Sequence, residues 1–266
     1  MKNNSYTFIT GASSGIGKSL ATECAKRRMN LVLIALPQTG LPAVAHAFQL
    51  RYDIEVIALE GDLTEISFIY SLANHLTTNN ISLSMLINNA GIGYEGKFDE
   101  LTVDFCNKLM LLNMQATVLL SRLLIENLKK CESSFILNVS SMASFTPMPY
   151  KCMYAASKSF VFSFSRALRN ELNESTISVS VLCPGAVPTN EMTKKLIASH
   201  GFYAKFFTVD ADELAIIAIR ETLRKKAVIV PGFGNKLSMY FMKIIPQSIQ
   251  LSVLANRYAK LNTSIS

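Results

Sequence analysis

The sequence predicts an α/β fold in which a doubly wound parallel sheet of about seven strands carries helices on both faces. Seven short apolar runs are typical of buried parallel strands: YTFIT, LVLIAL, EVIAL, SMLINNAG, FILNVSS, ISVSVLCPG and AVIVPG. Longer helical patterns separate them. Between the first two runs, Ile16, Leu20 and Cys24 recur every fourth residue, on one face of a helix. Strands that alternate with helices form βαβ units, and therefore a parallel sheet.

Length and composition predict one domain. The chain has 266 residues, of which 50% are hydrophobic and 17% charged, a balance typical of a well-buried globule. No Pro/Gly/Ser-rich or highly charged stretch divides it, so we expect residues 1–266 to form a single domain. No run reaches the roughly 18 to 20 consecutive apolar residues of a membrane-spanning helix.

Cysteine usage and charge indicate the compartment. The five cysteines form no CxxC pair and the three histidines lie far from them, so we expect neither a disulfide framework nor a metal site. The N-terminus, MKNNSYTFITG, lacks the apolar core of a signal peptide, and we expect a cytoplasmic protein. The net charge of +7 is dispersed among acids, which predicts a solvated surface that attracts an anionic cofactor, with no nucleic-acid partner.

A glycine-rich turn follows the first predicted strand. Residues 10–17 read TGASSGIG, a G-x-x-x-G-x-G spacing that is a variant of the dinucleotide fingerprint of Rossmann-type sheets. Missing β-carbons let the backbone approach a pyrophosphate, and the helix that begins here directs free N–H groups at it. The alternative is a tight strand-to-helix connection with no ligand. The expected phosphate contacts are Gly11, Ser13, Ser14, Gly15, Ile16 and Gly17.

The end of the second strand favours NADP over NAD. A carboxylate there binds the ribose hydroxyls of NAD, and an arginine binds the 2′-phosphate of NADP. This chain has Ala35-Leu36-Pro37 instead, so nothing repels a 2′-phosphate, and Leu36 is expected to lie beside the ribose. Polar contacts to the phosphate are available from Lys18, Gln38 and Thr39.

The third strand closes on Asp62 and Leu63, which we expect at the adenine. The Asp62 carboxylate accepts a hydrogen bond from the adenine amino group in this interpretation. A helix N-cap at Asp62 or Thr64 is the structural alternative, and the two roles are compatible.

Tyr154 and Lys158 begin a helix and, four residues apart, share one of its faces. A phenol has an unperturbed pKa near 10, so it needs a neighbouring cation to act near neutrality. Lys158 supplies such a cation. Taken alone, the pair is better explained as a snorkelling lysine beside a half-buried tyrosine.

The order of motifs resembles the short-chain dehydrogenase/reductase family from Thr10 to Thr189. The motifs are TGxxxGxG at residues 10–17, NNAG at 88–91, Asn113, Ser140-Ser141, Tyr154 with Lys158, and PGAVPT at 184–189. The resemblance implies an NAD(P)-binding Rossmann domain and an enzyme that moves hydride between the nicotinamide and a carbonyl or secondary alcohol.

The resemblance also assigns roles. It makes Tyr154 the acid-base group, and Lys158 both lowers the pKa of Tyr154 and holds the nicotinamide ribose. Ser141 orients the substrate oxygen, while Ser140 satisfies local backbone. Asn113, which a helical pattern alone would turn to solvent, anchors a relay water near Lys158. The other implied cofactor contacts are Asn89, Ala90, Gly91, Pro184, Gly185, Val187 and Thr189.

Two variable segments remain. A flap around residues 190–210 contains apolar side chains that favour a hydrophobic substrate, lipid-like, steroid-like or 3-oxoacyl, although a helix packed on the body would look the same. In the C-terminal segment 232–266, a closing helix is favoured over an interfacial membrane-binding helix. The resemblance also implies a homodimer or homotetramer.

Two other functions compete with the reductase. One is a nucleotide-binding sensor without catalysis, which has no use for the set of Asn113, Ser141, Tyr154 and Lys158. The other is an epimerase or dehydratase of the extended relatives, whose glycine spacing differs and whose chains are longer.

Overall fold

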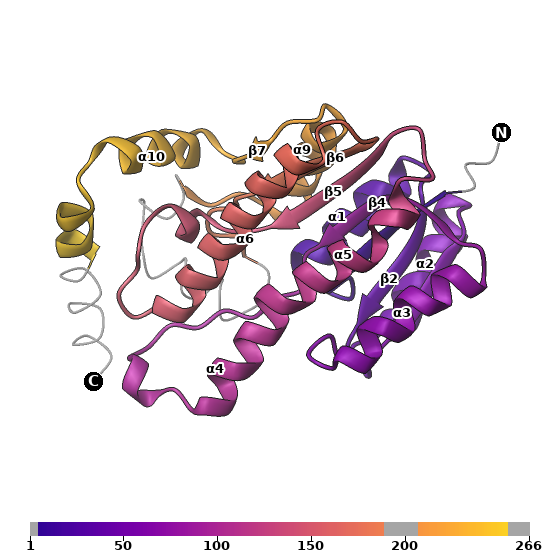
Figure 1. Cartoon of the computed structure of the whole chain (residues 1–266), viewed down its shortest axis with the longest axis horizontal. Helices are drawn as coiled ribbons and strands as arrows, with labels where there is room; N and C mark the ends of the chain where they lie inside the picture. Colours follow the sequence, from indigo (N-terminus) through magenta and orange to yellow (C-terminus); the bar gives the residue numbers. More distant parts are fainter. Residues whose placement is uncertain (1–4, 189–206, 255–266) are drawn as a thin grey trace.

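A computed structural model describes residues 5–188 and 207–254 and contains the predicted sheet. Its seven parallel strands lie in the order β3-β2-β1-β4-β5-β6-β7 (Figure 1). The strand bounds are β1 Ser5–Thr10, β2 Asn30–Ala35, β3 Val56–Glu60, β4 Ser82–Asn88, β5 Ser134–Val139, β6 Ile177–Leu182 and β7 Val228–Ile229. The strand order reverses between β1 and β4, which opens a crevice at the carboxyl ends of these strands.

Helices cover both faces of the sheet, as predicted (Figure 1). One face packs against α1 Gly15–Lys26, α2 Leu41–Tyr52 and α9 Ala211–Leu223. The other packs against α3 Ile66–Thr78, α5 Ala116–Leu128 and α6 Cys152–Glu171. Further helices in the described residues are η1 Phe98–Glu100, α4 Val103–Met110, η2 Leu111–Gln115, η3 Met142–Phe145 and α10 Phe233–Ile244, and residues 247–254 are helical as well.

The core alternates along each central strand. Leu31 and Leu33 of β2 pack towards α1 and α2, while Val32 and Ile34 pack towards the opposite layer, and all four are fully buried. Successive residues of a strand point to opposite faces, so a strand buried on both sides must be apolar at every position. This explains why the strands appear in the sequence as continuous apolar runs.

Two buried asparagines on neighbouring strands form a hydrogen bond with each other. Asn88 of β4 and Asn138 of β5 are paired in the ladder, and Asn88 Nδ2 donates to Asn138 Oδ1 at 2.8 Å. Asn88 Nδ2 also donates to Ser121 Oγ at 3.1 Å, and Asn138 Nδ2 donates to Ser165 Oγ at 2.8 Å. Ser121 lies on α5 and Ser165 on α6, so the amides tie the sheet to both helices.

One continuous helical run, from Val103 through η2 to Leu128, is long and apolar enough to cross a membrane by length and composition. Leu120, Leu124 and Leu128 on its inner side are buried against the sheet. In this structure one side of the run packs against the sheet.

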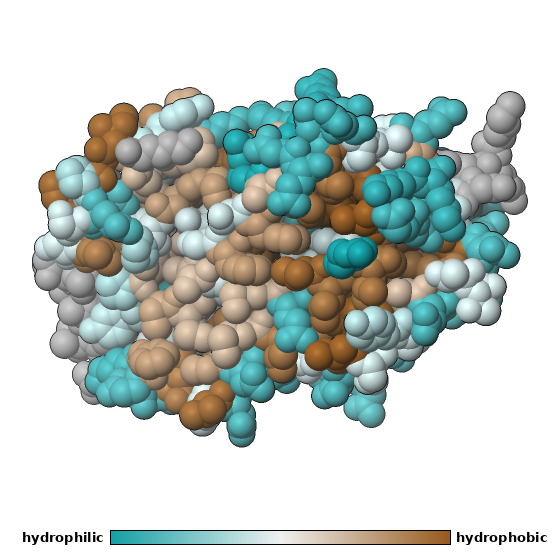
Figure 2. All heavy atoms as spheres, in the orientation of Figure 1, coloured by the Kyte–Doolittle hydropathy of each residue, from teal (hydrophilic) through white to brown (hydrophobic). Residues whose placement is uncertain are grey.

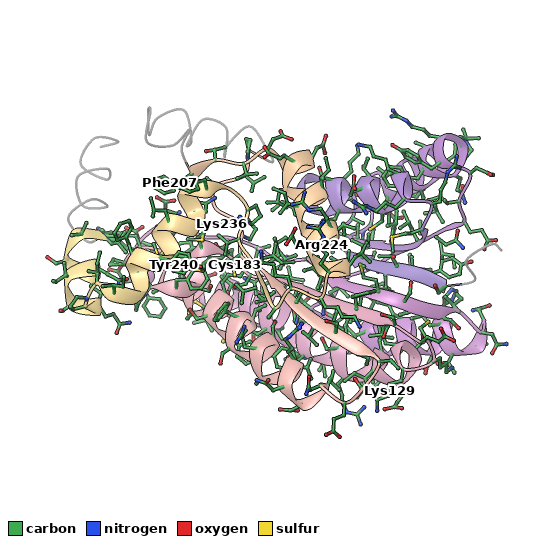
Figure 3. The ribbon with its side chains drawn as sticks, turned by 90° about the horizontal axis from the view of Figure 1, so that it is seen from above. Lys129, Cys183, Phe207, Arg224, Lys236 and Tyr240 are labelled. Carbon is green, nitrogen blue, oxygen red and sulfur yellow. The ribbon has the colours of Figure 1, made fainter. Side chains whose placement is uncertain are left out.

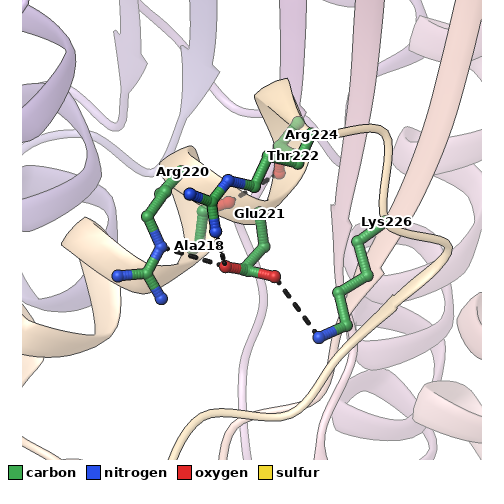
Figure 4. Close-up of polar contacts among 6 residues, drawn as sticks. All are labelled: Ala218, Arg220, Glu221, Thr222, Arg224 and Lys226. Atoms are coloured by element: carbon green, nitrogen blue, oxygen red, sulfur yellow. Dashed lines mark hydrogen bonds and ion pairs between the residues drawn. The ribbon is translucent and has the colours of Figure 1, made fainter.

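An ion-pair cluster fixes the turn between α9 and β7 (Figure 4). Glu221 accepts hydrogen bonds from Arg220 Nε at 2.9 Å, Lys226 Nζ at 3.3 Å and Arg224 Nη1 at 3.4 Å. The hydrogen bond from Arg220, opposed by burial, keeps the pKa of Glu221 below its usual range. Because β7 begins here, the cluster lies at the end of the sheet opposite the strand carboxyl ends. Its role is structural, because it joins the end of α9 to the turn before β7.

Candidate active site

The motif residues that the structure describes gather at one edge of the sheet. The glycine turn follows β1, Leu36 follows β2, Asp62 and Leu63 follow β3, and residues 89–91 follow β4. Ser141 follows β5, and Pro184, Gly185 and Val187 follow β6. Parallel strands present their carboxyl ends at the same edge, which explains why motifs far apart in sequence meet there. Thr189 lies outside the described residues, as does most of the 190–210 flap.

The glycine turn leaves room for a ligand's phosphates. Gly11 and Gly15 have φ of +66° and +52°, a region that favours glycine. A β-carbon on Gly17 would lie 2.0 Å from the Gly11 carbonyl oxygen, so only glycine fits there. The first N–H groups of α1 have no acceptor inside the helix, and the N-cap residue Ser14 makes no side-chain cap. This geometry fits an anionic diphosphate at the start of α1.

Asn89 holds the turn in place. Its Nδ2 donates to the carbonyl oxygens of Thr10, at 2.9 Å, and Gly11, at 3.3 Å. The Thr10 hydroxyl oxygen in return accepts the backbone N–H groups of Asn89 and Ala90, both at 2.9 Å. The side chain of Asn89 therefore supports the phosphate turn from behind.

The ends of β2 and β3 form the far part of the crevice. Ala35 is buried, while Leu36 is 45% exposed and its carbonyl accepts the Thr39 hydroxyl at 2.7 Å. Asp62 Oδ1 accepts the Thr64 N–H at 2.9 Å. The N-cap interpretation of Asp62 or Thr64 is wrong, because α3 begins at Ile66 with Glu65 as its N-cap residue.

Asn113 is buried in a π-helical turn, η2, which corrects the solvent-facing position that the helical pattern alone suggests. Asn113 Oδ1 accepts the Ile92 N–H at 2.9 Å, and Asn113 Nδ2 donates to the Ile92 carbonyl at 3.0 Å and to Ser157 Oγ at 3.1 Å. A π turn inserts one residue into a helix and is frequent at functional sites. Here it faces the segment after β4.

Lys158 lies beside Asn113. A β-carbon on Gly91 would be 3.0 Å from Asn113 Oδ1 and 3.3 Å from Lys158 Nζ, so both side chains border the same glycine. Lys158 is buried and donates to the Val139 carbonyl at 3.0 Å. Burial lowers the pKa of Lys158 to about 8, against an opposing contribution from Cys183.

Tyr154 and Ser141 are brought together. Burial raises the pKa of the half-buried Tyr154, while its side-chain hydrogen bond with Ser141 and the charge of Lys151 lower it. Two lysines are near Tyr154: the charge of Lys151 is the one that lowers its pKa here, and Lys158 Nζ lies over the ring, 5.8 Å from its centroid. Lys151 in turn pairs with Glu95 at 2.7 Å.

The two adjacent serines make different contacts. Ser140 Oγ donates to the Lys158 carbonyl at 2.7 Å, a local backbone contact. Ser141 starts η3, and its hydroxyl oxygen accepts the Ala143 N–H at 3.1 Å while the side chain also meets Tyr154. Ser141 thus lies on the reactive side of the pair.

The segment after β6 is shaped by its neighbours. The Pro184 carbonyl accepts the Met142 N–H at 2.8 Å, which joins this segment to η3. A β-carbon on Gly185 would lie 2.4 Å from Asn235 Oδ1, so this glycine permits α10 to pack closely. Val187 is buried in the core. The turn interpretation of Pro184 and Gly185 is supported by these contacts.

Sequence reasoning missed four supporting residues. Thr10, Ser157, Glu95 and Lys151 carry the contacts described above. Thr10 is part of the glycine motif and Ser157 lies between Tyr154 and Lys158, so both are sequence neighbours of predicted site residues. Glu95 and Lys151 are 56 residues apart in the numbering and gave no pairing signal.

A pocket of about 480 Å³ opens next to this site, between residues 144–149, α6 and the helical residues 247–254. Ala155, Ala156 and Ser159 line it, but Tyr154 and Ser141 do not. It lies beside the site formed by Ser141 and Tyr154.

Comparison with known proteins agrees with the geometry. A family model described as short chain dehydrogenase matches residues 5–200. Human 17-beta-hydroxysteroid dehydrogenase type 3 is 31% identical over 98% of this chain and 84% of its own length. The very-long-chain 3-oxoacyl-CoA reductase of Anas platyrhynchos is 32% identical over 69% of this chain, and the match spans 60% of that relative.

Solved structures share the fold. A short-chain dehydrogenase from Sphingobium yanoikuyae, solved in complex with NADPH, is 28% identical with a TM-score of 0.76, covering 91% of this chain and 97% of that one. The bulky-bulky ketone specific alcohol dehydrogenase from Comamonas testosteroni is 27% identical with a TM-score of 0.75, covering 91% and 95%.

Proposed function

Because this chain belongs to the short-chain dehydrogenase family, we propose that it is an NADP(H)-dependent oxidoreductase that interconverts a carbonyl and a secondary alcohol on a hydrophobic substrate. The observation that carries the proposal is the meeting of Asn113, Ser141, Tyr154 and Lys158 at the sheet edge that also holds the glycine turn. A protein that only binds a nucleotide needs no phenol beside a serine, which disfavours the nucleotide-binding sensor without catalysis.

The cofactor fits the residues present. The N–H groups of residues 15–17 would hold its diphosphate, with Gly11, Ser13 and Ser14 around it. Leu36 would lie at the ribose, Asp62 and Leu63 at the adenine, and residues 89–91 along the nicotinamide ribose with Lys158. Pro184, Gly185, Val187 and Thr189 would bound the nicotinamide. When bound, the group supplies a hydride to the carbonyl carbon.

The chain's own residues supply the proton chemistry. Tyr154 gives its hydroxyl proton to the substrate oxygen during reduction and takes it back during oxidation. Ser141 donates a hydrogen bond to the same oxygen as negative charge develops on it. Lys158, positioned by its hydrogen bond to the Val139 carbonyl, would hold the nicotinamide ribose, and Asn113 fixes the segment at Ile92 beside it.

A hydrophobic substrate is supported by the relatives. Their names refer to a hydroxysteroid, a very-long-chain 3-oxoacyl-CoA and a bulky ketone. The flap expected to select among such substrates lies outside the described residues, except for 207–210.

Three broader proposals accompany this function. Residues 1–266 form one domain, supported by a single sheet that runs from Ser5 to Ile229. The subunits form a homodimer or homotetramer, supported by exposed apolar side chains at Val103, Met110 and Phe160. The protein works in the cytoplasm, consistent with its five free cysteines, all of which lie in the described part.

A panel of steroid ketones, 3-oxoacyl thioesters and bulky aryl ketones tests the function. We expect the absorbance of NADPH to fall with at least one of them, and the alcohol product to restore it with NADP⁺. Tight NADPH binding without turnover on any member would instead support the sensor, and turnover without net change in NADPH would support an epimerase.

Leu36→Asp is expected to move cofactor preference towards NADH. The exposed position beside the ribose gains a carboxylate that accepts the ribose hydroxyls and repels a 2′-phosphate. Hydrogen bonds to charged groups contribute about 1.5 to 3 kcal/mol, so the ratio of kcat/KM for NADPH over NADH should fall by about tenfold to hundredfold. The matched control is Leu50→Asp, an exposed position on α2, which should leave the ratio unchanged. A wild type that prefers NADH would contradict the assignment.

Lys151 and Glu95 are expected to shift the pH profile in opposite directions. Lys151→Met removes a charge that lowers the pKa of Tyr154, so alcohol oxidation, which needs the phenolate, should reach its plateau at higher pH. Glu95→Gln removes the carboxylate that pairs with Lys151, and the plateau should move to lower pH. Lys97→Met, at an exposed lysine of the same loop, serves as control. Shifts of the same sign in the first two variants would refute the coupling.

A further inference from the structure

The helix α10 differs from an ordinary surface helix, because a polar side chain faces the protein and apolar side chains face outwards. Its inner side carries Asn235, which is buried and donates to the Pro231 carbonyl at 2.9 Å and the Phe207 carbonyl at 3.2 Å. Met239, also on that side, packs against the small cluster of Val181, Cys183 and Val230. The inner side of α10 therefore packs on the body of the protein.

The outer side of α10 is apolar. Phe233 is 75% exposed and Ile244 is 78% exposed, and Leu237, Tyr240 and Phe241 between them are exposed as well. These five residues recur at intervals of three and four, so they share one face. Figure 3 labels Tyr240 and Lys236 on this helix. Solvent-facing helix surfaces are normally polar, and a contiguous apolar patch marks an interaction site.

A second helical segment continues this surface. Residues 247–254 are helical, and Ile249 and Val253 are exposed on them. Gln250 Nε2 donates to the carbonyls of Met242 and Ile245, both at 2.7 Å, which ties the segment to the end of α10. Figure 2 shows hydrophobic residues at the end of the molecule where the two helices lie. The C-terminal apolar face consists of Phe233, Leu237, Tyr240, Phe241, Ile244, Ile245, Ile249 and Val253.

We propose that the C-terminal apolar face binds the surface of an anionic phospholipid bilayer. The α10 helix has 12 residues and the chain leaves helical structure at Ile245 and Pro246. The α10 helix is thus far shorter than the ~20 residues needed to cross a bilayer, and its inner side is engaged with the protein. A short helix with one apolar face, bordered by aromatic residues, lies in the interface plane.

The positive charge of the C-terminal segment favours an anionic lipid surface over a second copy of the chain as the partner of the C-terminal apolar face. Residues 227–266 contain no Asp or Glu, whereas they contain the basic residues Lys236, Lys243, Arg257 and Lys260. Anionic headgroups attract such a segment. A two-fold dimer through this face would place identical basic segments against each other, which like-charge repulsion disfavours.

Vesicle sedimentation of the full chain tests the proposal. We expect the wild type to bind vesicles of phosphatidylcholine mixed with phosphatidylserine more tightly than vesicles of phosphatidylcholine alone, with the difference lost at high salt. Phe241→Ser combined with Ile244→Ser should weaken binding to the mixed vesicles at least about tenfold, because each side chain loses favourable burial. Lys236→Gln should weaken binding to the mixed vesicles only.

A matched control tests whether vesicle binding depends on the C-terminal apolar face or on exposed apolar side chains in general. Leu50→Ser combined with Tyr70→Ser removes two side chains that are 75% and 50% exposed on α2 and α3. These variants should bind vesicles like the wild type, and circular dichroism should show that both double variants are folded. The proposal is overturned if the wild type binds neither vesicle, or if both double variants lose binding equally. It is likewise overturned if the wild type ignores vesicles but self-associates through Phe241 and Ile244. None of these measurements depends on the reductase activity.

Discussion

Tyr154→Phe is expected to lower kcat by at least about 10²-fold, the scale of general acid-base catalysis. The substitution removes only the hydroxyl, which is both the proton donor and the partner of Ser141. The ring stays beside Gly93, so the shape of the site is retained. NADPH affinity should change little, because the N–H groups at the start of α1 and the glycine turn are untouched.

Stopped-flow reduction of a good ketone substrate measures this effect, with NADPH titration in parallel. The matched control is Tyr70→Phe, at an exposed tyrosine of α3 that none of the contacts of Tyr154, Ser141 or Lys158 involves. A Tyr154→Phe enzyme that turns over at the wild-type rate would show that another group gives the proton. Loss of NADPH binding in the same variant would show that the ring, rather than its hydroxyl, is what the site requires.

Lys158→Met should reduce both turnover and cofactor affinity. The ammonium borders Gly91 and Asn113, where the nicotinamide ribose would lie, and it anchors to the Val139 carbonyl. Loss of hydrogen bonds from a charged donor costs about 1.5 to 3 kcal/mol, or about tenfold to hundredfold in NADPH affinity. Unchanged affinity would contradict the ribose contact.

The same variant carries a pH signature in its stability. Burial lowers the pKa of Lys158 to about 8, so between that value and the usual pKa of about 10.4 the unfolded chain binds the proton and the folded chain does not. The unfolding free energy of the wild type should therefore rise with pH across this window relative to Lys158→Met. Urea titrations on either side of the window measure it, and Lys108→Met, an exposed lysine of α4, should show no such difference.

The parallel sheet and the meeting of the motifs were predictable because each motif directly follows an apolar run. Once the runs are parallel strands, their carboxyl ends must share an edge. The burial of Asn113 was not predictable, since a π turn adds one residue to the helix and changes which face an asparagine occupies. The effect of Lys151 on Tyr154 depends on side-chain placement next to Glu95, which no spacing encodes. The exposure of α10 is likewise a tertiary property, because the same residues would suit a buried helix.

The paired asparagines of β4 and β5 select the register of the sheet centre. Asn88 stands directly opposite Asn138, and each amide also reaches a serine on the adjoining helix layer. If β5 slipped by one residue, every side chain would change face, and Asn138 would leave both Asn88 and Ser165. A buried amide without a partner costs about 1 to 3 kcal/mol, whereas an apolar strand alone would tolerate the slip at lower cost. Misaligned strand pairings are therefore disfavoured during folding. In the correct register, Ser141 follows β5 next to Tyr154, and Pro184 follows β6 next to η3.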